Sequence, residues 1–299
     1  MATAAANETG PPPAAPYLFK RHALAVRITH WVNALAIAFL IGTGLNIFNA
    51  HPSLYWGDAG ATTDTRGRWL EIGAVPNAAG EQRGKTRVGP VMVDTTGVLG
   101  LANGPGGRPQ AQGFPSWSTF PSVRDLATAR SWHFFFGWIF VLNGMLYLGF
   151  GIWSGHLRHD LIPRLREMKL SNIWHDVVTH AKLRFPKGED AKRYHILQKL
   201  SYASTALVVL PLLVLTGLAM SPSMGATTGW LIELFGGRQS ARSIHFICMV
   251  LTTAFIVVHV LMVVLAGPYN EIRSMITGRF RVPPDRKAAA IEELEGEAA

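Results

Sequence analysis

The stretch that decides the fold is IHFICMVLTTAFIVVHVLMVVLA, residues 244–266. As a helix it is long and apolar enough to cross a hydrocarbon core of roughly 30 Å. It holds two histidines, His245 and His259, fourteen residues apart. This spacing is just under four helical turns, so both side chains lie on one face of the helix, about 21 Å apart along its axis. Coordinating side chains inside a membrane are costly and usually functional, so the pattern indicates a redox metal or haem in each half of the bilayer.

The composition extends this interpretation to the whole chain. Hydrophobic residues make up 48% of the 299 residues and charged residues only 16%, which is typical of a membrane protein. Four runs are apolar enough to span the bilayer, and none has a charged residue in its central part. These runs cover about 28–48, 132–153, 200–220 and 244–266. The sequence therefore predicts an all-α membrane protein with four transmembrane helices.

Basic residues in the connections predict the orientation. Lys20, Arg21 and Arg27 precede the first span, and the connection at 154–199 holds ten Lys or Arg against five Asp or Glu. By the positive-inside rule these segments and both termini face the cytoplasm, and the connection at 49–131 is external. We therefore expect a multi-pass protein of the bacterial cytoplasmic (inner) membrane, with the long connection on the periplasmic side.

The ends of the chain and its charge add further limits. Residues 1–19 lack an apolar core, so we expect a disordered tail and no cleaved signal peptide before a membrane domain at 20–282 and a C-terminal tail at 283–299. The net charge of +9 reflects topology and attraction to anionic membrane lipids, and no nucleic-acid binding is predicted. A single cysteine, Cys248, excludes an intrachain disulfide and the CxxCH attachment of a c-type haem.

Two more histidines lie near the ends of other spans. His30 stands near the cytoplasmic start of the first span and His133 near the external start of the second. The fourth span runs inward, which places His245 near the external surface and His259 near the cytoplasmic one. Depth alone therefore pairs His133 with His245 and His30 with His259.

Three of these histidines follow an arginine at the same spacing. Arg27, Arg130 and Arg242 each stand three residues before a histidine, on the same helix face and one turn farther toward the headgroups. A guanidinium there can bind a haem propionate bidentately. The three arginines are therefore predicted to hold propionates, with simple anchoring of helix ends as the alternative.

Small residues and loop segments leave alternatives open. Glycines of the spans, together with GTGL at 42–45 and its echo LTGL at 215–218, suit either close approach of a macrocycle or ordinary helix packing. Pro211 is expected to bend the third span. The external connection contains strand-like runs such as VGPVMVD at 88–94, and it is interpreted as a docking surface for an external partner or as disorder.

The constellation resembles a known family, the bacterial di-haem b-type cytochromes, which include cytochrome b561 and the membrane subunits of nickel–iron hydrogenase and formate dehydrogenase. The residues that carry the resemblance are RITHWVNA at 27–34, RSWHFFFGW at 130–138 and the two histidines of the fourth span. It covers roughly 17–280. The run GGRQSARSIHF at 236–246 looks closest to the cytochrome b subunits of thiosulfate reductases.

The resemblance implies a four-helix transmembrane bundle that binds two haems, and it also implies their ligands and a quinone substrate. In the family the matching histidines are axial ligands of two b haems, paired as depth indicates: His133 with His245, and His30 with His259. A YNxGQK motif of the family contributes to a site for ubiquinone or menaquinone. This chain has Tyr194, His195, Gln198 and Lys199 there, with His195 in place of the asparagine and Leu197 in place of the glycine. His195 is therefore expected either to hydrogen-bond a quinone carbonyl or to be an interfacial residue without a role.

These observations predict an electron-transfer subunit of a respiratory oxidoreductase complex. It would anchor a periplasmic redox enzyme, most simply a molybdopterin-dependent oxidoreductase, and connect it with the quinone pool. A membrane transporter or assembly scaffold that uses histidines for a metal or a proton is the alternative, although the spans lack the carboxylates that transporters usually carry. A bare anchor that does not conduct is a further alternative. No motif of a stand-alone hydrolase or transferase is present in the sequence.

Overall fold

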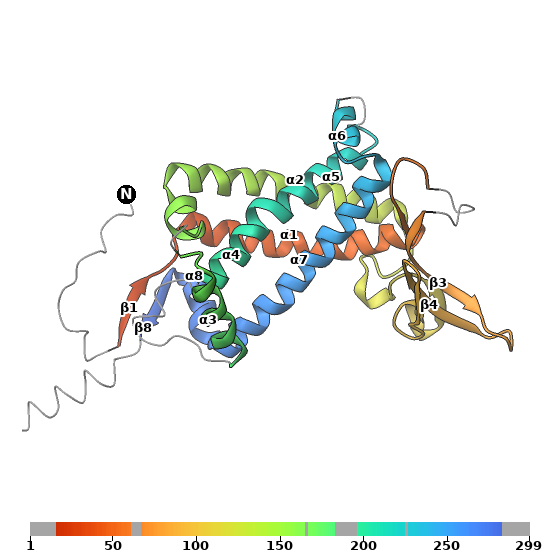
Figure 1. Cartoon of the computed structure of the whole chain (residues 1–299), viewed down its shortest axis with the longest axis horizontal. Helices are drawn as coiled ribbons and strands as arrows, with labels where there is room; N and C mark the ends of the chain where they lie inside the picture. The colour runs from red at the N-terminus through yellow and green to blue at the C-terminus, as the bar shows by residue number, and fades with distance from the viewer. Residues whose placement is uncertain (1–15, 61–66, 165–166, 183–195, 225–226, 283–299) are drawn as a thin grey trace, which may run out of the picture. The chain divides into compact units, whose positions relative to one another are not determined.

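The structure is a computed structural model that describes residues 16–60, 67–164, 167–182, 196–224 and 227–282. Within these residues four helical segments are long and apolar enough to cross a membrane, which confirms the predicted number of spans. They are Leu24–Ala50 (α1), Leu126–Trp153 (α2), Ile196–Met220 (α4 and α5) and Arg238–Ala266 (α7) (Figure 1). The expectation of an all-α protein is correct only in part, because eight strands accompany the helices in the described residues.

The helices begin earlier than the apolar runs because polar groups cap them. The carboxylate of Asp125 accepts a hydrogen bond from the Thr128 backbone N–H at 3.0 Å, as an N-cap does, so α2 begins at Leu126. This contact and the Thr128 hydroxyl lower the pKa of Asp125. At the start of α7, the Gly57 carbonyl accepts the backbone N–H groups of Gln239 and Ser240 at 3.0 and 3.1 Å. Both caps lie outside the apolar pattern, which therefore underestimates helix length.

The third span is irregular where a proline was expected to bend it. It consists of α4 (Ile196–Ser204), a π-helical turn (Thr205–Val209) and α5 (Leu210–Met220), with Pro211 in the first turn of α5. Proline has no N–H to donate to the preceding turn, and the wider π-helical turn accommodates that gap.

The chain divides into two compact units: Met1–Trp31 with Gly144–Val208 and Thr253–Ala299, and Val32–Asn143 with Val209–Thr252. In the first unit, strand β1 (Tyr17–Lys20) pairs antiparallel with β8 (Arg279–Val282), which follows α8 (Pro268–Thr277). The disordered tail predicted for 1–19 is therefore wrong at its end, because Tyr17, Leu18 and Phe19 pair with Val282, Arg281 and Phe280 near the other end of the chain. Residues 1–15 and the predicted tail at 283–299 lie outside the described residues.

The same unit contains the connection between α2 and α4. A π-helical turn at Leu157–Leu161 is followed by α3 (Leu170–Ala181), in the region 154–199 that was predicted to be cytoplasmic. The carboxylate of Asp176 in α3 accepts the backbone N–H of Ile196 at 3.0 Å. This contact ties α3 to the first residue of α4.

In the second unit two apolar clusters hold the helices together. Ala36, Phe136 and Phe140 form a buried cluster between α1, α2 and α5. Ala219, Leu231 and Ala241 form another, which joins α5 and α7 to the short helix α6 (Gly229–Leu234). An interhelical hydrogen bond adds to the first cluster, as Asn143 donates to the Asn33 side chain at 2.7 Å. Such amide contacts stabilise helix pairs in apolar surroundings.

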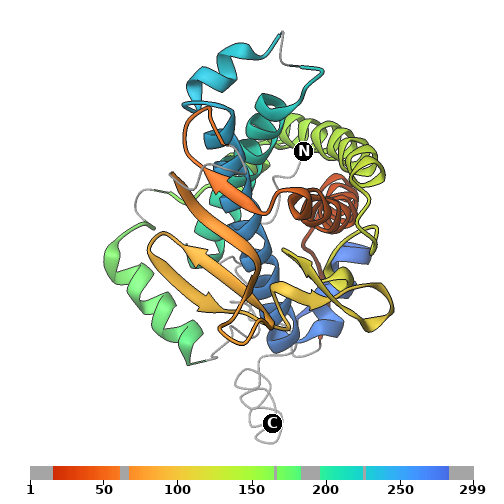
Figure 2. The ribbon, with the colours of Figure 1, turned by 90° about the vertical axis from the view of Figure 1, so that its right-hand side faces the viewer.

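The long connection 49–131 belongs to the second unit and is folded. Strands β2 (Ser53–Tyr55), β3 (Arg68–Pro76), β4 (Gln82–Val88) and β5 (Val91–Asp94) form an antiparallel sheet in that order. Strands β6 (Gly100–Asn103) and β7 (Pro109–Gln112) form a hairpin that packs against β3 and β4, as Figure 2 shows. Two 3₁₀ turns, Pro105–Gly107 and Ser116–Ser118, complete the connection. The strand-like run at 88–94 contains the last residue of β4, a turn and β5, so the strand prediction is correct for part of it. The disorder alternative is wrong for residues 67–125.

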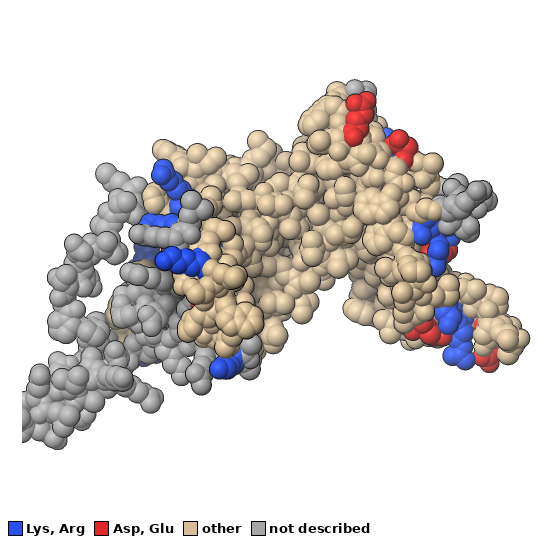
Figure 3. Space-filling model, viewed as in Figure 1, with Lys and Arg blue, Asp and Glu red and all other residues tan. Residues whose placement is uncertain are grey.

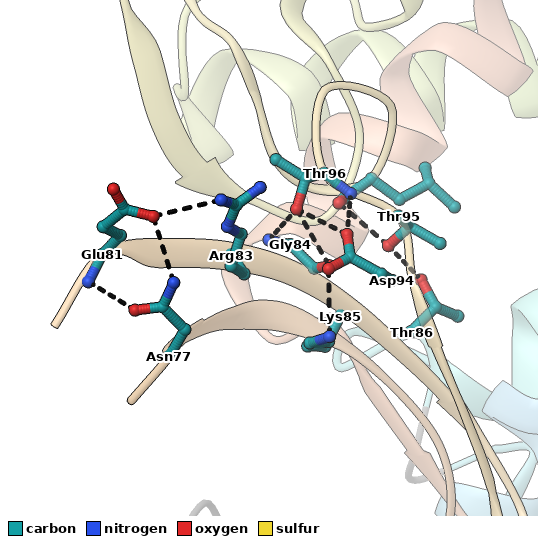
Figure 4. A network of polar contacts seen from close by, with 10 residues as sticks. Asn77, Glu81, Arg83, Gly84, Lys85, Thr86, Asp94, Thr95 and Thr96 are labelled. Carbon is teal, nitrogen blue, oxygen red and sulfur yellow. Dashed lines mark hydrogen bonds and ion pairs between the residues drawn. The ribbon is translucent and has the colours of Figure 1, made fainter. Parts of the chain in front are cut away.

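Ion pairs and turn contacts stabilise this sheet (Figure 4). The Asp94 carboxylate accepts hydrogen bonds from the Thr96 hydroxyl at 2.7 Å and backbone N–H at 3.0 Å, and it pairs with Lys85 at 3.0 Å. These contacts hold the pKa of Asp94 well below its usual range. Figure 3 shows blue and red side chains close together on the β3–β4 hairpin, whereas most of the helical surface in this view is tan. The charges are those of a hairpin exposed to water, and the tan helices are those of membrane spans.

Candidate haem-binding sites

Two of the predicted histidines meet in the second unit. His133 in α2 and His245 in α7 have ring centroids 6.3 Å apart, with the ring planes tilted by 58°. Each ring has a threonine hydroxyl at its Nδ1 atom: Thr43 in α1 lies 2.9 Å from His133, and Thr216 in α5 lies 3.0 Å from His245. Each of the four spans therefore contributes one residue here, either a histidine of the pair or a threonine that contacts it.

The other two histidines meet in the first unit. His30 in α1 and His259 in α7 have ring centroids 6.4 Å apart and ring planes tilted by 62°. Aromatic rings surround this pair: Phe255 stacks on His259 at 5.7 Å and Tyr202 meets it edge to face at 6.0 Å. The Nδ1 atom of His30 is buried and has no hydrogen-bond partner among the described residues.

The spacing of both pairs fits a bis-histidine haem. An imidazole nitrogen lies about 2.0 Å from a first-row metal and the ring centre about 1.1 Å farther, so two axial imidazoles have centroids about 6.2 Å apart. The observed separations are 6.3 and 6.4 Å. Neutral imidazoles on facing helices of a bundle are also the donor set of b-type cytochromes. The residues present therefore fit this group at both positions.

Comparison with known proteins agrees with this geometry. The family model of the prokaryotic cytochrome b561 matches residues 21–278, nearly the whole chain. The chain belongs to the prokaryotic cytochrome b561 family. A relative from Azospira oryzae, the "Putative protein-methionine-sulfoxide reductase subunit YedZ1", is 36% identical over 153 residues, which are 51% of this chain and 72% of that protein. Together with four apolar helices, the family makes this chain an integral membrane protein. The likeness to thiosulfate reductase subunits stays a prediction.

The three arginines predicted to hold propionates have different surroundings in this cytochrome b561-family chain. Arg242 donates to the His51 carbonyl at 2.5 Å and stands over the Phe48 ring, 5.6 Å from its centre. Arg27 donates to the Ile276 carbonyl at the end of α8. Arg130 is exposed. The first two guanidinium groups thus have protein partners already, and propionate binding stays a prediction for all three.

Basic groups gather near the His30–His259 pair. Arg21 forms an ion pair with Glu271 in α8 at 3.2 Å, and its guanidinium lies 4.7 Å from the centre of the Phe280 ring. Burial, followed by the positive charge of Arg21 and the nearness of His30, lowers the pKa of His22 from 6.5 to about 4. His22 is therefore neutral at physiological pH in the folded protein.

The residues expected at a quinone site are only partly described. Tyr194 and His195 lie outside the described residues. Gln198 and Lys199 lie in α4, both partly buried, and the Lys199 ammonium is 3.1 and 3.2 Å from the two carboxylate oxygens of Glu167. The structure therefore places a lysine–carboxylate pair at the start of the third span.

Sequence reasoning missed the two threonines as site residues. The sequence feature that could have identified them is the similarity of GTGL at 42–45 to LTGL at 215–218. That similarity was interpreted only as a hint of an internal repeat, or as part of ordinary helix packing. In the structure these two segments hold the hydroxyls that contact His133 and His245.

Proposed function

We propose that this chain carries electrons across the bacterial inner membrane, between the quinone pool and a periplasmic redox enzyme, through two b-type haems. The two histidine pairs, each with the ring separation expected across one iron, support this function above any other feature. Both pairs include a histidine of α7, fourteen residues apart, so one continuous helix supplies a ligand to each site.

The chain's own residues would hold and orient the groups. His133 and His245 would bind one haem and His30 and His259 the other, each through its Nε2 atom. A bound b-type haem supplies reversible one-electron transfer at its iron. Apolar side chains of the spans exclude water from the sites, and Arg27, Arg130 and Arg242 would stand toward the propionates. With the basic connections on the cytoplasmic side, the His30–His259 site is the inner one.

At the inner end we propose a quinone site formed by Tyr194, His195, Gln198 and Lys199. The family likeness of this segment supports it, and so does the pairing of Lys199 with Glu167 at 3.1 Å. An ammonium–carboxylate pair can pass on a proton when a quinol is oxidised. Amide and imidazole groups beside it can hydrogen-bond the quinone oxygens.

At the outer end we propose that the folded connection 49–131 docks the partner enzyme. Its sheet exposes apolar residues of the edge strand β5, with Val91, Met92 and Val93 each more than half exposed. The name of the Azospira oryzae relative indicates the partner's chemistry, because it describes a subunit of a protein-methionine-sulfoxide reductase. We propose a periplasmic, molybdopterin-dependent oxidoreductase that acts on oxidised methionine in proteins.

Spectroscopy of the purified full-length chain tests the proposal. We expect two b-type haems per chain by pyridine haemochrome analysis, a bis-histidine low-spin signature, and reduction of haem on addition of a quinol. A chain without haem, or with one haem, would contradict the proposed function. Two haems that no quinol reduces would leave a haem protein but refute the quinone connection.

A further inference from the structure

Two short segments recur around the His133–His245 pair. Thr-Gly-Leu occurs at 43–45 in the first span and again at 216–218 in the third. Arg-Ser-x-His-Phe occurs at 130–134 in the second span and again at 242–246 in the fourth. The structure joins the copies in the same way, because each threonine contacts the histidine of the span that follows it.

The two contacts have nearly the same geometry. The threonine oxygen lies 2.9 Å from Nδ1 of His133 in one copy and 3.0 Å from Nδ1 of His245 in the other. Thr43 also lies 2.7 Å from the Phe39 carbonyl, and Thr216 lies 2.6 Å from the Leu212 carbonyl. Both threonines are completely buried. Such agreement between two contacts made by different helices indicates a shared role.

The glycine after each threonine belongs to the same arrangement. A Cβ atom built on Gly44 would lie 3.4 Å from Cε1 of His133, and one on Gly217 would lie 3.5 Å from Cε1 of His245. Each ring therefore rests against the helix backbone at a glycine, with its Nδ1 edge toward the hydroxyl. A Cβ at either position would be in van der Waals contact with the ring, so only a small side chain fits beside it.

The hydrogen-bond direction follows from counting protons. A threonine hydroxyl has one proton and two acceptor lone pairs. The short contact to the carbonyl four residues earlier uses that proton, because a carbonyl oxygen can only accept. The hydroxyl oxygen must then accept a proton from the imidazole, so Nδ1 of each histidine carries its hydrogen. The lone pair of each neutral ring is left on Nε2.

Given the haem-binding function proposed above, we propose that Thr43 and Thr216 are positioning residues that fix His133 and His245 as Nδ1–H tautomers, so that both rings present Nε2 to one iron. When a histidine binds a metal through one ring nitrogen, a group that accepts a hydrogen bond from the other ring N–H fixes the orientation of the imidazole and increases its basicity. A more basic ligand favours ferric over ferrous haem. The threonines therefore lower the reduction potential of this haem. His30 receives no such contribution from the described part of the chain, where its Nδ1 has no hydrogen-bond partner.

The test uses the full-length, haem-loaded chain with T43V and T216V, which replace a hydroxyl by a methyl group of similar size. T43S and T216S restore the hydroxyl. The matched control is T252V: Thr252 is a buried threonine of α7 whose hydroxyl donates to the Cys248 carbonyl at 2.8 Å, the same bond to the residue four positions earlier. Redox titration followed at the haem α band gives two midpoint potentials, and His30→Ala assigns the one that belongs to His133 and His245. Haem transfer to apomyoglobin gives dissociation rates.

We expect T43V and T216V each to raise the midpoint potential of the His133–His245 haem only, and to speed its dissociation by about tenfold. The serine variants should return both values toward the wild type, and T252V should change neither. If a valine variant loses this haem altogether, retention of the haem by the serine variant and by T252V would still show that the hydroxyl supports this site. Unchanged potentials in both valine variants, or equal shifts at both haems, would overturn the proposal. Absence of two bis-histidine haems from the wild type would instead refute the proposed function.

Discussion

The two histidine pairs share a ring spacing but differ in what supports the rings. His133 and His245 contact threonine hydroxyls at 2.9 and 3.0 Å, on helices that approach closely at glycines. His259, by contrast, stacks against Phe255, and Nδ1 of His30 has no partner among the described residues. One pair is therefore oriented by hydrogen bonds and the other by ring packing. The same ligand geometry thus has two physical origins, and only the first one acts on the basicity of the ligands.

The pairs also differ in nearby charge. On the His30–His259 side, the partly buried His22 has its pKa lowered to about 4 by desolvation and then by Arg21 and His30. On the other side, burial and then Arg242 lower the pKa of His51, but the carboxylate of Glu71 opposes this shift. The charge of Arg21 is balanced by its ion pair with Glu271, so it does not set the potential of a haem there. We expect the His30–His259 haem to have the higher potential because the rings of the other pair contact threonine hydroxyls.

The largest predicted effect separates the two pairs by ligand removal. His133→Ala and His30→Ala should each leave one haem of two and reduce quinol-dependent electron delivery to an external acceptor by more than the roughly 100-fold typical of outer-shell changes. If quinol is oxidised beside His30, His133→Ala should still allow quinol to reduce the remaining haem, and His30→Ala should not. Stopped-flow reduction with a quinol analogue measures this difference. Equal rates of haem reduction in the two variants would contradict the placement of the quinone site, and intact delivery in His133→Ala would indicate a bare anchor.

A smaller effect concerns acid stability. The folded pKa of His22, about 4, lies below its unfolded value of 6.5, so the unfolded state binds the proton first. The stability that neutral His22 contributes is complete above pH 6.5, declines as the pH falls, and is lost near pH 4. At about 1.4 kcal/mol for each pKa unit, the shift from 6.5 to about 4 corresponds to at most about 3.5 kcal/mol.

Thermal unfolding in detergent at pH 7.5 and 4.5 measures this contribution. His22→Gln should lose less stability on acidification than the wild type. His51→Gln, the matched change beside the other pair, should have a smaller influence because Glu71 opposes the shift of His51. If His22→Gln lost as much stability on acidification as the wild type, the proposed electrostatic difference between the two histidine pairs would be contradicted.

The sequence predicted the features that repeat along a single helix. Apolar length defined four spans, and depth on those spans paired His133 with His245 and His30 with His259, as the ring contacts now do. These inferences succeed because a helix in a bilayer has a fixed rise and few charged positions. The ligand roles themselves stay predictions.

Features that depend on distant parts of the chain were beyond the sequence pattern. Strand β4, QRGKTRV, is too polar to be recognised alone and exists through pairing with β3 and β5. Strand β1 requires β8, far away in the sequence. The threonine contacts join residues of different helices. In the sequence, a threonine whose hydroxyl bonds the backbone of its own helix cannot be distinguished from one that also faces a histidine. Thr43 and Thr252 differ only in that respect.

The smallest predicted effect tests ring packing as the support of the second pair. Phe255 lies one turn before His259 in α7, and its ring is nearly parallel to the imidazole, with 9° between the planes and 5.7 Å between the centroids. Phe255→Leu keeps an apolar side chain but removes the flat surface. The His259 ring should then rotate more freely, and haem at this site should dissociate faster by a factor on the order of 3 to 10. Its midpoint potential should stay nearly constant because no hydrogen bond to the ligand changes.

The control is Phe246→Leu, which alters a ring packed on Phe48 in the other unit and should leave the dissociation rate at the His30–His259 site unchanged. If Phe255→Leu instead shifted the potential as strongly as T43V does at the other haem, hydrogen bonding and ring packing would not be separate means of support, and the contrast between the two pairs would be lost.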